Sequence, residues 1–262
     1  MTRNLNSKLI VFTTAIILCF TFISVSAAET VYSWYCVHRK DHNQPAAAPE
    51  FSFLIDHNGY YIDKLHGDNS DSKVIYLTFD AGYENGNIEK ILDVLKAEKV
   101  PGAFFILGNL IEKNADLVCR MFDEGHTVCN HTYSHKAMIG KSKSEFENEL
   151  IKLEKTCLEV TGHEISKYYR PPEGKFDEES LKYADELGYK TIFWSFAYAD
   201  WDNTKQMSYE KAKNKILENI HNGEIMLLHP TSATNAEILK DVIHEIKAQG
   251  FRFGTLDELR RG

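Results

Sequence analysis

Residues 74–82 read Val-Ile-Tyr-Leu-Thr-Phe-Asp-Ala-Gly, and this stretch decides the fold class. The run Val74–Phe79 is made of apolar, aromatic and β-branched residues, which is the composition of a β-strand. Asp80 closes the strand, and Gly82 belongs to the loop that follows it. The carboxylate therefore stands where strand and loop meet.

Similar runs recur along the chain and alternate with helical patterns. We predict further strands at Ala103–Leu107, Thr127–Asn130, Lys167–Tyr169, Thr191–Trp194, Ile225–Leu228 and Phe251–Phe253. The clearest helix is Ser142–Thr161, in which apolar residues recur at spacings of three and four: Phe146, Leu150, Leu153, Cys157 and Val160. Strands that alternate with helices build parallel sheets. No Gly-x-Gly-x-x-Gly follows the first strand, which disfavours a dinucleotide fold. We predict an α/β fold, a distorted (β/α)7-type barrel of parallel strands with an N-terminal extension.

The start of the chain has the pattern of a secretory signal. Two cations precede an uncharged apolar run over residues 9–25, and the small residues Ser26, Ala27 and Ala28 follow it. We expect residues 1–27 to be a signal peptide, cleaved after Ala27 or Ala28; an uncleaved signal anchor is the alternative. The protein is therefore expected to be exported.

The remaining chain divides into two parts. Residues 28–71 lack a clear periodicity, carry an Ala/Pro stretch at 44–49 and contain an Asn-Gly turn at 58–59. We interpret them as an N-terminal extension that packs on the main domain. Residues 72–262 carry the alternating strand and helix pattern and form that main domain.

Charge and cysteine content exclude two classes of protein. The net charge is −8, with 30 Lys and Arg against 38 Asp and Glu, and no basic patch that would bind nucleic acid stands out. Outside the signal, Cys36, Cys119, Cys129 and Cys157 form no Cys-x-x-Cys pair, so a zinc ribbon is excluded. We expect buried reduced thiols, although an exported protein can form disulfides.

Ionisable residues follow five of the predicted strands. They are Asp80, His131, Arg170, Asp200 and His229. In parallel α/β barrels the carboxyl ends of the strands build the active site. We therefore expect these five side chains to converge on one rim of the barrel.

His131 and His135 form a His-x-x-x-His pair. On a helical turn, residues four apart share a face, so both imidazoles could reach one cation. Two histidines at this spacing also occur by chance, so the spacing alone leaves a metal site and a pair of unrelated histidines both open. Thr132 stands where a zinc protease carries its Glu, so a general base must come from elsewhere.

The segment Arg170-Pro171-Pro172-Glu173-Gly174 is predicted to be rigid and extended. Because prolines lack an N–H, the Glu173 amide is the first free donor after them and a candidate for binding an oxyanion. Taken alone, this segment also fits a plain loop. Asp200 could likewise orient an imidazole or serve only as a turn residue.

Together these motifs resemble the polysaccharide deacetylases of the nodulation-deacetylase type, carbohydrate esterase family 4. The motifs occur in order as Thr78-Phe79-Asp80, His131-x-x-x-His135, Arg170-Pro171-Pro172-x-Gly174, Asp200-Trp201 and Leu227-Leu228-His229. The resemblance covers residues 72–260. Within the family, the Gly-Tyr-Glu-Asn-Gly sequence at 82–86 is similar to that of the delta-lactam-biosynthetic de-N-acetylases of spore-forming bacteria. This implies removal of the N-acetyl group from muramic acid in peptidoglycan, which leads to muramic δ-lactam in the spore cortex.

The resemblance also implies roles for the motif residues. Asp80 would be the general base that activates water. His131 and His135 would bind a divalent metal, zinc or a similar ion, that polarises the acetyl carbonyl. The Glu173 N–H would help to hold the oxyanion.

His229 would be the general acid that protonates the leaving amine. Asp200 would tune His229, and Arg170 would keep Asp80 ionised. Leu227 and Trp201 would line a pocket for the acetyl methyl group.

The sequence departs from the family pattern at three positions. Ala81 replaces an acid that is usually a metal ligand, so the metal would keep two protein ligands and bind weakly; the lactam-forming subgroup typically lacks this acid too. Glu173 replaces a common Tyr, which leaves the backbone N–H in place. Ala197 replaces the first Asp of the fourth motif.

Two other functions are compatible with these residues. One is deacetylation of N-acetylglucosamine in peptidoglycan or chitin-like chains, and the other is an inactive glycan-binding module whose metal site has decayed. For the leading function we expect a peptidoglycan glycan strand as substrate, and a muramoyl amidase that acts upstream on it. We also expect a monomer located in the cell-wall or spore-cortex space.

Overall fold

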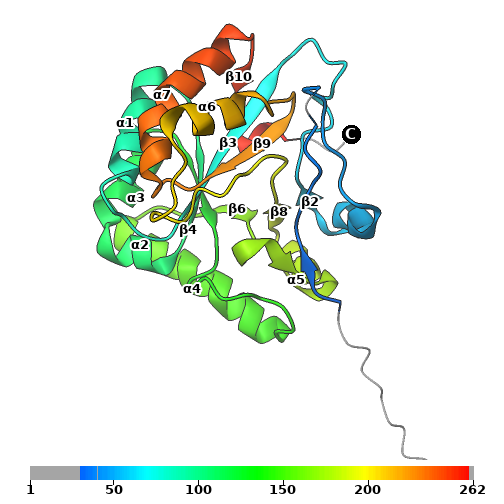
Figure 1. Cartoon of the computed structure of the whole chain (residues 1–262). Helices are drawn as coiled ribbons and strands as arrows, with labels where there is room; N and C mark the ends of the chain where they lie inside the picture. Colours follow the sequence, from blue (N-terminus) through cyan, green and yellow to red (C-terminus); the bar gives the residue numbers. More distant parts are fainter. Residues whose placement is uncertain (1–29, 40, 260–262) are drawn as a thin grey trace, which may run out of the picture.

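The computed structural model describes residues 30–39 and 41–259. The predicted signal peptide lies outside these residues. A curved parallel sheet forms the centre, helices cover one side of it, and the N-terminal segment lies on the other side, at the right in Figure 1. Within the described ranges no helix is long and apolar enough to cross a membrane.

Parallel strands build the barrel. The strands are β2 (Gly59–Tyr60), β3 (Val74–Ala81), β4 (Ala103–Ile106), β5 (Thr127–Asn130), β6 (Ser166–Tyr169), β8 (Lys190–Ile192), β9 (Glu224–Leu228) and β10 (Arg252–Phe253). Their order is β10-β3-β4-β5-β6-β8-β2, and β9 pairs with β3. A parallel bridge from Phe196 to Met226 and an antiparallel bridge from Ile62 to Glu224 link the two ends of this order. The predicted barrel-type α/β fold is confirmed.

The helices follow the strands as the alternating pattern predicts. They are α1 (Ile88–Glu98), α2 (Gly108–Lys113), α3 (Ala115–Asp123), α4 (Lys143–Thr161), α5 (Glu178–Glu186), α6 (Tyr209–Leu217) and α7 (Ala233–Ala248). Helix α4 begins at a capping box made by Ser142 and Glu145 and ends at Gly162, whose φ is 76°. The prediction that Val160 belongs to the buried apolar stripe of α4 is wrong. Val160 is 47% exposed, because the buried stripe ends at Cys157, one turn before the helix does.

Alternation along β3 decides which side chains reach the barrel mouth. Ile75, Leu77 and Phe79 pack in the apolar layer beneath the helices, whereas Val74 and Tyr76 pack inside the barrel. Because side chains alternate along a strand, Thr78 and Asp80 also face the inside. Asp80 stands near the carboxyl end of the strand.

The N-terminal segment contributes strands to two sheets. Its β1 (Tyr32–Ser33) forms a separate antiparallel two-stranded sheet with β7 (Lys175–Phe176), and β2 pairs with β8 in the main sheet. Trp34 packs against Phe51, Tyr61 and Phe193, and its Nε1 donates a hydrogen bond to the Trp194 carbonyl at 2.8 Å. The described residues also form 3-10 helices: η1 (Pro49–His57), η2 (Pro172–Gly174) and η3 (Leu256–Glu258).

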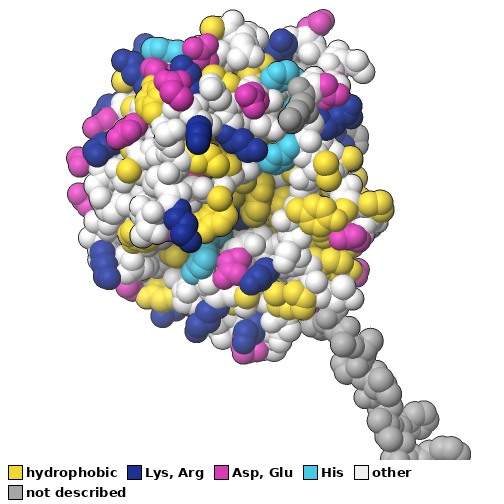
Figure 2. Space-filling model, viewed as in Figure 1, with side chains coloured by type: hydrophobic (Ala, Val, Ile, Leu, Met, Phe, Trp, Pro, Cys, Tyr) yellow, Lys and Arg dark blue, Asp and Glu magenta, His cyan; other side chains and the backbone are white. Residues whose placement is uncertain are grey.

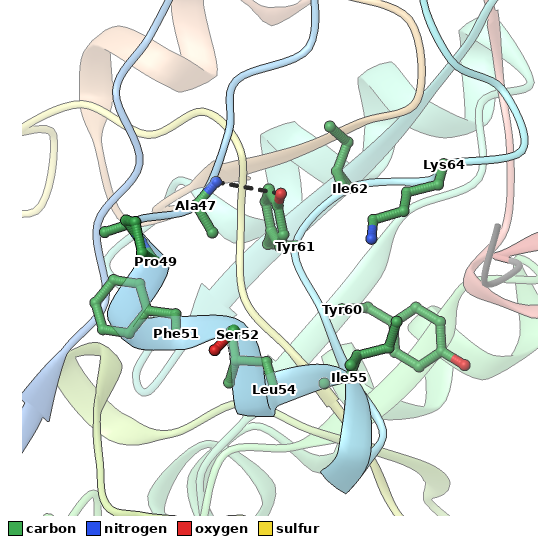
Figure 3. Close-up of a pocket in the computed structure, with 12 residues that line it drawn as sticks. Ala47, Pro49, Phe51, Ser52, Leu54, Ile55, Tyr60, Tyr61, Ile62 and Lys64 are labelled. Atoms are coloured by element: carbon green, nitrogen blue, oxygen red, sulfur yellow. Dashed lines mark hydrogen bonds between the residues drawn. The ribbon is translucent and has the colours of Figure 1, made fainter.

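A pocket of about 300 Å³ lies between η1 and β2. Figure 3 shows its apolar lining, and the Ala47 amide donates a hydrogen bond to the Tyr61 hydroxyl at 3.2 Å. None of the predicted site residues lines this pocket. Figure 2 shows apolar side chains gathered over the same N-terminal segment, and charged side chains of both signs interspersed on the rest of that face.

All four described cysteines are free. Cys129 and Cys157 are buried, and Cys36 and Cys119 are half-buried. Burial raises the pKa of the Cys36 thiol to about 12, with Glu224 adding to the effect. These thiols are packing groups in this fold.

We predict that Trp34→Ala lowers the free energy of unfolding by about 3–5 kcal/mol, because it empties an aromatic cluster that joins the N-terminal segment to β8. Chemical denaturation measures the change. Val37→Ala, at a highly exposed neighbouring position, should stay within about 0.5 kcal/mol of the unsubstituted protein. Equal stabilities of the two variants would contradict this account.

Candidate active site

The carboxyl ends of the strands bring the predicted ionisable residues together. Asp80 is the last residue but one of β3, and its carboxylate interacts with Arg170, His131 and His229. His229 in turn contacts Asp200. The five residues predicted at five strand ends thus form one continuous cluster at the mouth of the barrel.

Arg170 is the centre of this cluster, and its side chain is entirely buried. Its Nη1 donates to Asp80 Oδ1 at 2.7 Å, and its Nη2 donates to Thr78 Oγ1 at 2.9 Å. The guanidinium also donates to two carbonyls at the end of β8, those of Ile192 at 3.0 Å and Phe193 at 3.3 Å. One side chain therefore ties β6, β3 and β8 together.

Positive charge keeps the Asp80 carboxylate ionised. Burial acts to raise its pKa, but the charge and hydrogen bond of Arg170, together with the charge of His229, outweigh burial and lower the pKa below the ordinary value. The second oxygen, Oδ2, lies 3.6 Å from His131 Nε2. A carboxylate held in this way is an acceptor ready to take a proton.

His131 and His135 lie side by side, with ring centroids 4.9 Å apart. The helical turn expected for them is wrong, because residues 131–138 lie in a loop after β5. Thr132 and His135 have φ values of 68° and 57°. The Thr132 amide donates to Asn130 Oδ1 at 2.9 Å, and the His135 amide donates to Thr132 Oγ1 at 3.0 Å. Side-chain hydrogen bonds to the backbone therefore bend the loop and bring the two rings together.

Contacts from two helices fix this loop. Glu149 of α4 accepts hydrogen bonds from the Ser134 amide at 3.0 Å and from the Ser134 hydroxyl at 2.9 Å. The Gly108 amide at the start of α2 donates to the Tyr133 carbonyl at 3.0 Å. The imidazole pair is therefore held by the scaffold on both sides.

The two imidazoles are chemically suited to bind a metal ion, although they supply only two ligands. His131 Nδ1 donates to the Arg170 carbonyl at 2.8 Å, which leaves Nε2 as the free nitrogen. Burial lowers the pKa of His131 to about 4, so the ring is neutral, which is the form that binds metals. Among the described residues no group of three His, Cys, Asp or Glu side chains is arranged to hold a metal. Ala81 is buried in the apolar layer and offers no oxygen.

The pKa of His229 is shifted in the direction opposite to that of His131. Burial acts to lower its pKa, but the hydrogen bond and charge of Asp200 outweigh burial, and the pKa is raised. His229 Nδ1 lies 2.7 Å from Asp200 Oδ1, and the His229 amide donates to Asp200 Oδ2 at 2.8 Å. Asn235 Nδ2 donates to the same Oδ2 at 2.6 Å. The His229 ring is therefore oriented by a fixed carboxylate.

The remaining predicted residues occupy different surroundings. Glu173 has a φ of 58°, and the pKa of its exposed carboxyl is lowered by Lys175 and, more weakly, by His135. Its backbone amide thus belongs to the turn beside the imidazole pair. Leu227 is buried in β9 opposite Thr78. The exposed Trp201 ring lies 6.0 Å from the His229 ring, at 65° to it.

Sequence reasoning did not assign roles to two supporting residues. Thr78 belongs to a quoted motif, but its bond to Arg170 depends on the register of β3 and was not predicted. Asn235, in the first turn of α7, contacts both Asp200 and the His229 carbonyl. It follows His229 by six residues and carries no motif, so no sequence signal pointed to it.

Comparison with known proteins identifies relatives along most of the chain. A family model for polysaccharide deacetylase matches residues 67–192. The peptidoglycan-N-acetylmuramic acid deacetylase PdaA of Bacillus subtilis (strain 168) is 38% identical over 228 residues, which cover 87% of this chain and 85% of PdaA. A peptidoglycan-N-acetylglucosamine deacetylase of Bacillus cereus is 35% identical over 189 residues, 71% of this chain and 67% of that protein.

The fold agrees with a solved structure. The structure of Bacillus subtilis PdaA, a family 4 carbohydrate esterase, matches with a TM-score of 0.83 at 37% identity. The match covers 89% of this chain and 98% of that one. A match of this extent is longer than residues 72–262 and therefore reaches into the residues that precede them.

We predict that Arg170→Ala lowers the free energy of unfolding by about 3–5 kcal/mol, because it leaves the Asp80 carboxylate buried without its cation. Denaturant titration measures the loss. Adding Asp80→Asn to this variant should restore part of the stability, since no buried charge then remains. A double variant as unstable as Arg170→Ala would show that the ion pair is not the cause.

Proposed function

The chain belongs to the polysaccharide deacetylase family, carbohydrate esterase family 4, and from this premise we propose that it hydrolyses the N-acetyl group of N-acetylmuramic acid in peptidoglycan. The products are acetate and a free amine on the sugar. The observation that carries the proposal is the geometry of the barrel mouth, where Arg170 Nη1 binds Asp80 Oδ1 at 2.7 Å and His229 Nδ1 lies 2.7 Å from Asp200 Oδ1. The muramic acid specificity is supported by the name of the relative PdaA, which matches over most of both chains.

Asp80 acts as the general base. The Arg170 guanidinium occupies Oδ1 at 2.7 Å, so Oδ2 is the oxygen that can accept a proton from the attacking water. Because Arg170 is buried and bound to four acceptors, the carboxylate cannot rotate away from this position without breaking the charge-assisted bond.

His229 acts as the general acid. Asp200 holds Nδ1, so the proton on Nε2 is the one available to the departing amine nitrogen. Amide hydrolysis needs this proton because an amide anion is a poor leaving group. The hydrogen bond and charge of Asp200 raise the pKa of His229, which favours the protonated form of the ring.

The developing oxyanion requires donors and positive charge. The Glu173 amide supplies a donor in the turn after two prolines. A divalent ion such as zinc, bound by His131 and His135, would polarise the acetyl carbonyl. Leu227 and Trp201 would contact the acetyl methyl group. With Ala81 in place of a third ligand, we expect weak metal affinity.

Two alternatives lead to different results in the same assay. Deacetylation of N-acetylglucosamine would use the same residues on the neighbouring sugar, and the Bacillus cereus relative carries that activity in its name. A glycan-binding module without turnover is the other alternative. The intact ion pairs of Asp80 and His229 favour an enzyme.

The setting of the reaction is part of the proposal. The predicted signal peptide implies export to the cell-wall or spore-cortex space. A product with a free amine next to the lactyl carboxylate could close to muramic δ-lactam. Such closure needs a muramic acid without its stem peptide, which implies an amidase that acts first. We propose a monomer.

The proposal is tested by mass spectrometry of peptide-stripped glycan strands incubated with residues 28–262. We expect loss of acetyl at muramic acid, followed by loss of water, when zinc is present and not when a chelator is present. Asp80→Asn should abolish both losses. Acetyl loss confined to N-acetylglucosamine would support the second function, and no loss on either sugar would support the binding module.

The role of His229 predicts a change in pH dependence. Asp200→Asn removes the charge that raises the His229 pKa, so the alkaline limb of kcat/KM should move to lower pH by about one to three units. Activity at neutral pH should fall and recover partly in acid. Asp202→Asn, an exposed carboxylate in the same loop, is the matched control and should leave the profile unchanged. An unshifted limb in Asp200→Asn would exclude His229 as the acid.

A further inference from the structure

Two aromatic rings stand exposed beside the site on loops that follow different strands. Tyr83, in the loop after β3, is 47% exposed, and Trp201, in the loop after β8, is 60% exposed. A single exposed aromatic residue on a protein surface is common. What distinguishes this pair is the way in which their loops are joined.

A closed set of hydrogen bonds connects the loops around the site. Asn203 Nδ2, two residues after Trp201, donates to the Tyr83 hydroxyl at 3.1 Å. Asn85 and Asn87 of the Tyr83 loop both donate to the Thr231 carbonyl, at 2.8 and 3.0 Å. Thr231 follows His229 by two residues. The Tyr83 loop is therefore fixed both to the Trp201 loop and to the loop of the general acid.

Further hydrogen bonds hold each of the two loops in place. Glu84 accepts a hydrogen bond from the Ile88 amide at 3.0 Å, and Asn109 Nδ2 donates to the Gly82 carbonyl at 3.1 Å. In the Trp201 loop, Gln206 Nε2 donates to the carbonyls of Asp200 and Asp202 at 2.8 and 2.9 Å. Rings on loops held this firmly lose little conformational entropy when they bind a ligand.

We propose that Tyr83 forms a stacking platform for the sugar next to the one being deacetylated, continuing the site along the glycan strand. This inference rests on the proposed function and deepens it. A pyranose ring presents a face of C–H groups, which packs well on the face of an aromatic ring. Tyr83 is then a positioning residue: it contacts the strand away from the reacting bond and holds the strand in register.

The chemistry of the surroundings favours a neutral polymer over a charged or apolar one. Asn85 and Asn203 are exposed close to Tyr83, and their side chains donate within the joined loops through Nδ2. Neutral amide groups of this kind can also accept hydrogen bonds from sugar hydroxyls through Oδ1.

The test compares Tyr83→Ala on two substrates, the single sugar N-acetylmuramic acid and long peptide-stripped strands. We expect KM for long strands to rise about three- to tenfold with kcat unchanged, and both constants for the single sugar to stay as in the unsubstituted protein. Tyr83→Phe keeps the ring and should retain most of the affinity for strands. Tyr35→Ala, a similarly exposed tyrosine at 48% in the N-terminal segment, is the control and should change neither substrate.

Three results would overturn the platform. They are an unchanged KM for long strands in Tyr83→Ala, an equal loss on the single sugar, and a loss in Tyr83→Phe as large as that in Tyr83→Ala. Binding of long strands to Asp80→Asn, with and without Tyr83→Ala, is measured calorimetrically without turnover. Tyr83-dependent binding there upholds the platform even if no strand is deacetylated, so failure of the proposed function and failure of the platform are distinguished.

Discussion

The buried ion pair between Arg170 and Asp80 is the interaction on which the rest of the site depends. A guanidinium with no solvent contact needs its charge balanced and its donors satisfied, and Asp80, Thr78 and two carbonyls of the β8 end do both. The same bonds hold three strand ends at fixed separations. The stability of the barrel mouth and the ionisation of the base therefore have one cause.

The pKa values of the two histidines at the barrel mouth are shifted in opposite directions. His131 donates to the Arg170 carbonyl and is buried, so it stays neutral and keeps a lone pair on Nε2. His229 is buried too, but the Asp200 carboxylate at 2.7 Å raises its pKa. Environments that separate the pKa values of neighbouring groups are what acid–base chemistry requires.

Most strand positions and helix α4 followed from the sequence because burial imposes simple periods on it, whereas β2 lies in a segment without such a period and was not predicted. The convergence of Asp80, His131, Arg170, Asp200 and His229 followed from parallel topology. Local loop geometry did not follow. The His131–His135 pair forms through two residues in left-handed conformations, whereas spacing had indicated a helical turn. Asn235 reaches Asp200 only through the packing of α7, which no local pattern encodes.

The central claim is that the Asp80 charge and His229 share one site. The most direct measurement is the pKa of His229. It is obtained by NMR titration of the metal-free protein with and without Asp80→Asn. Because the Asp80 charge raises this pKa, the account predicts a lower His229 pKa in the variant, with the histidines outside the site unchanged. An identical His229 pKa in both proteins would contradict it.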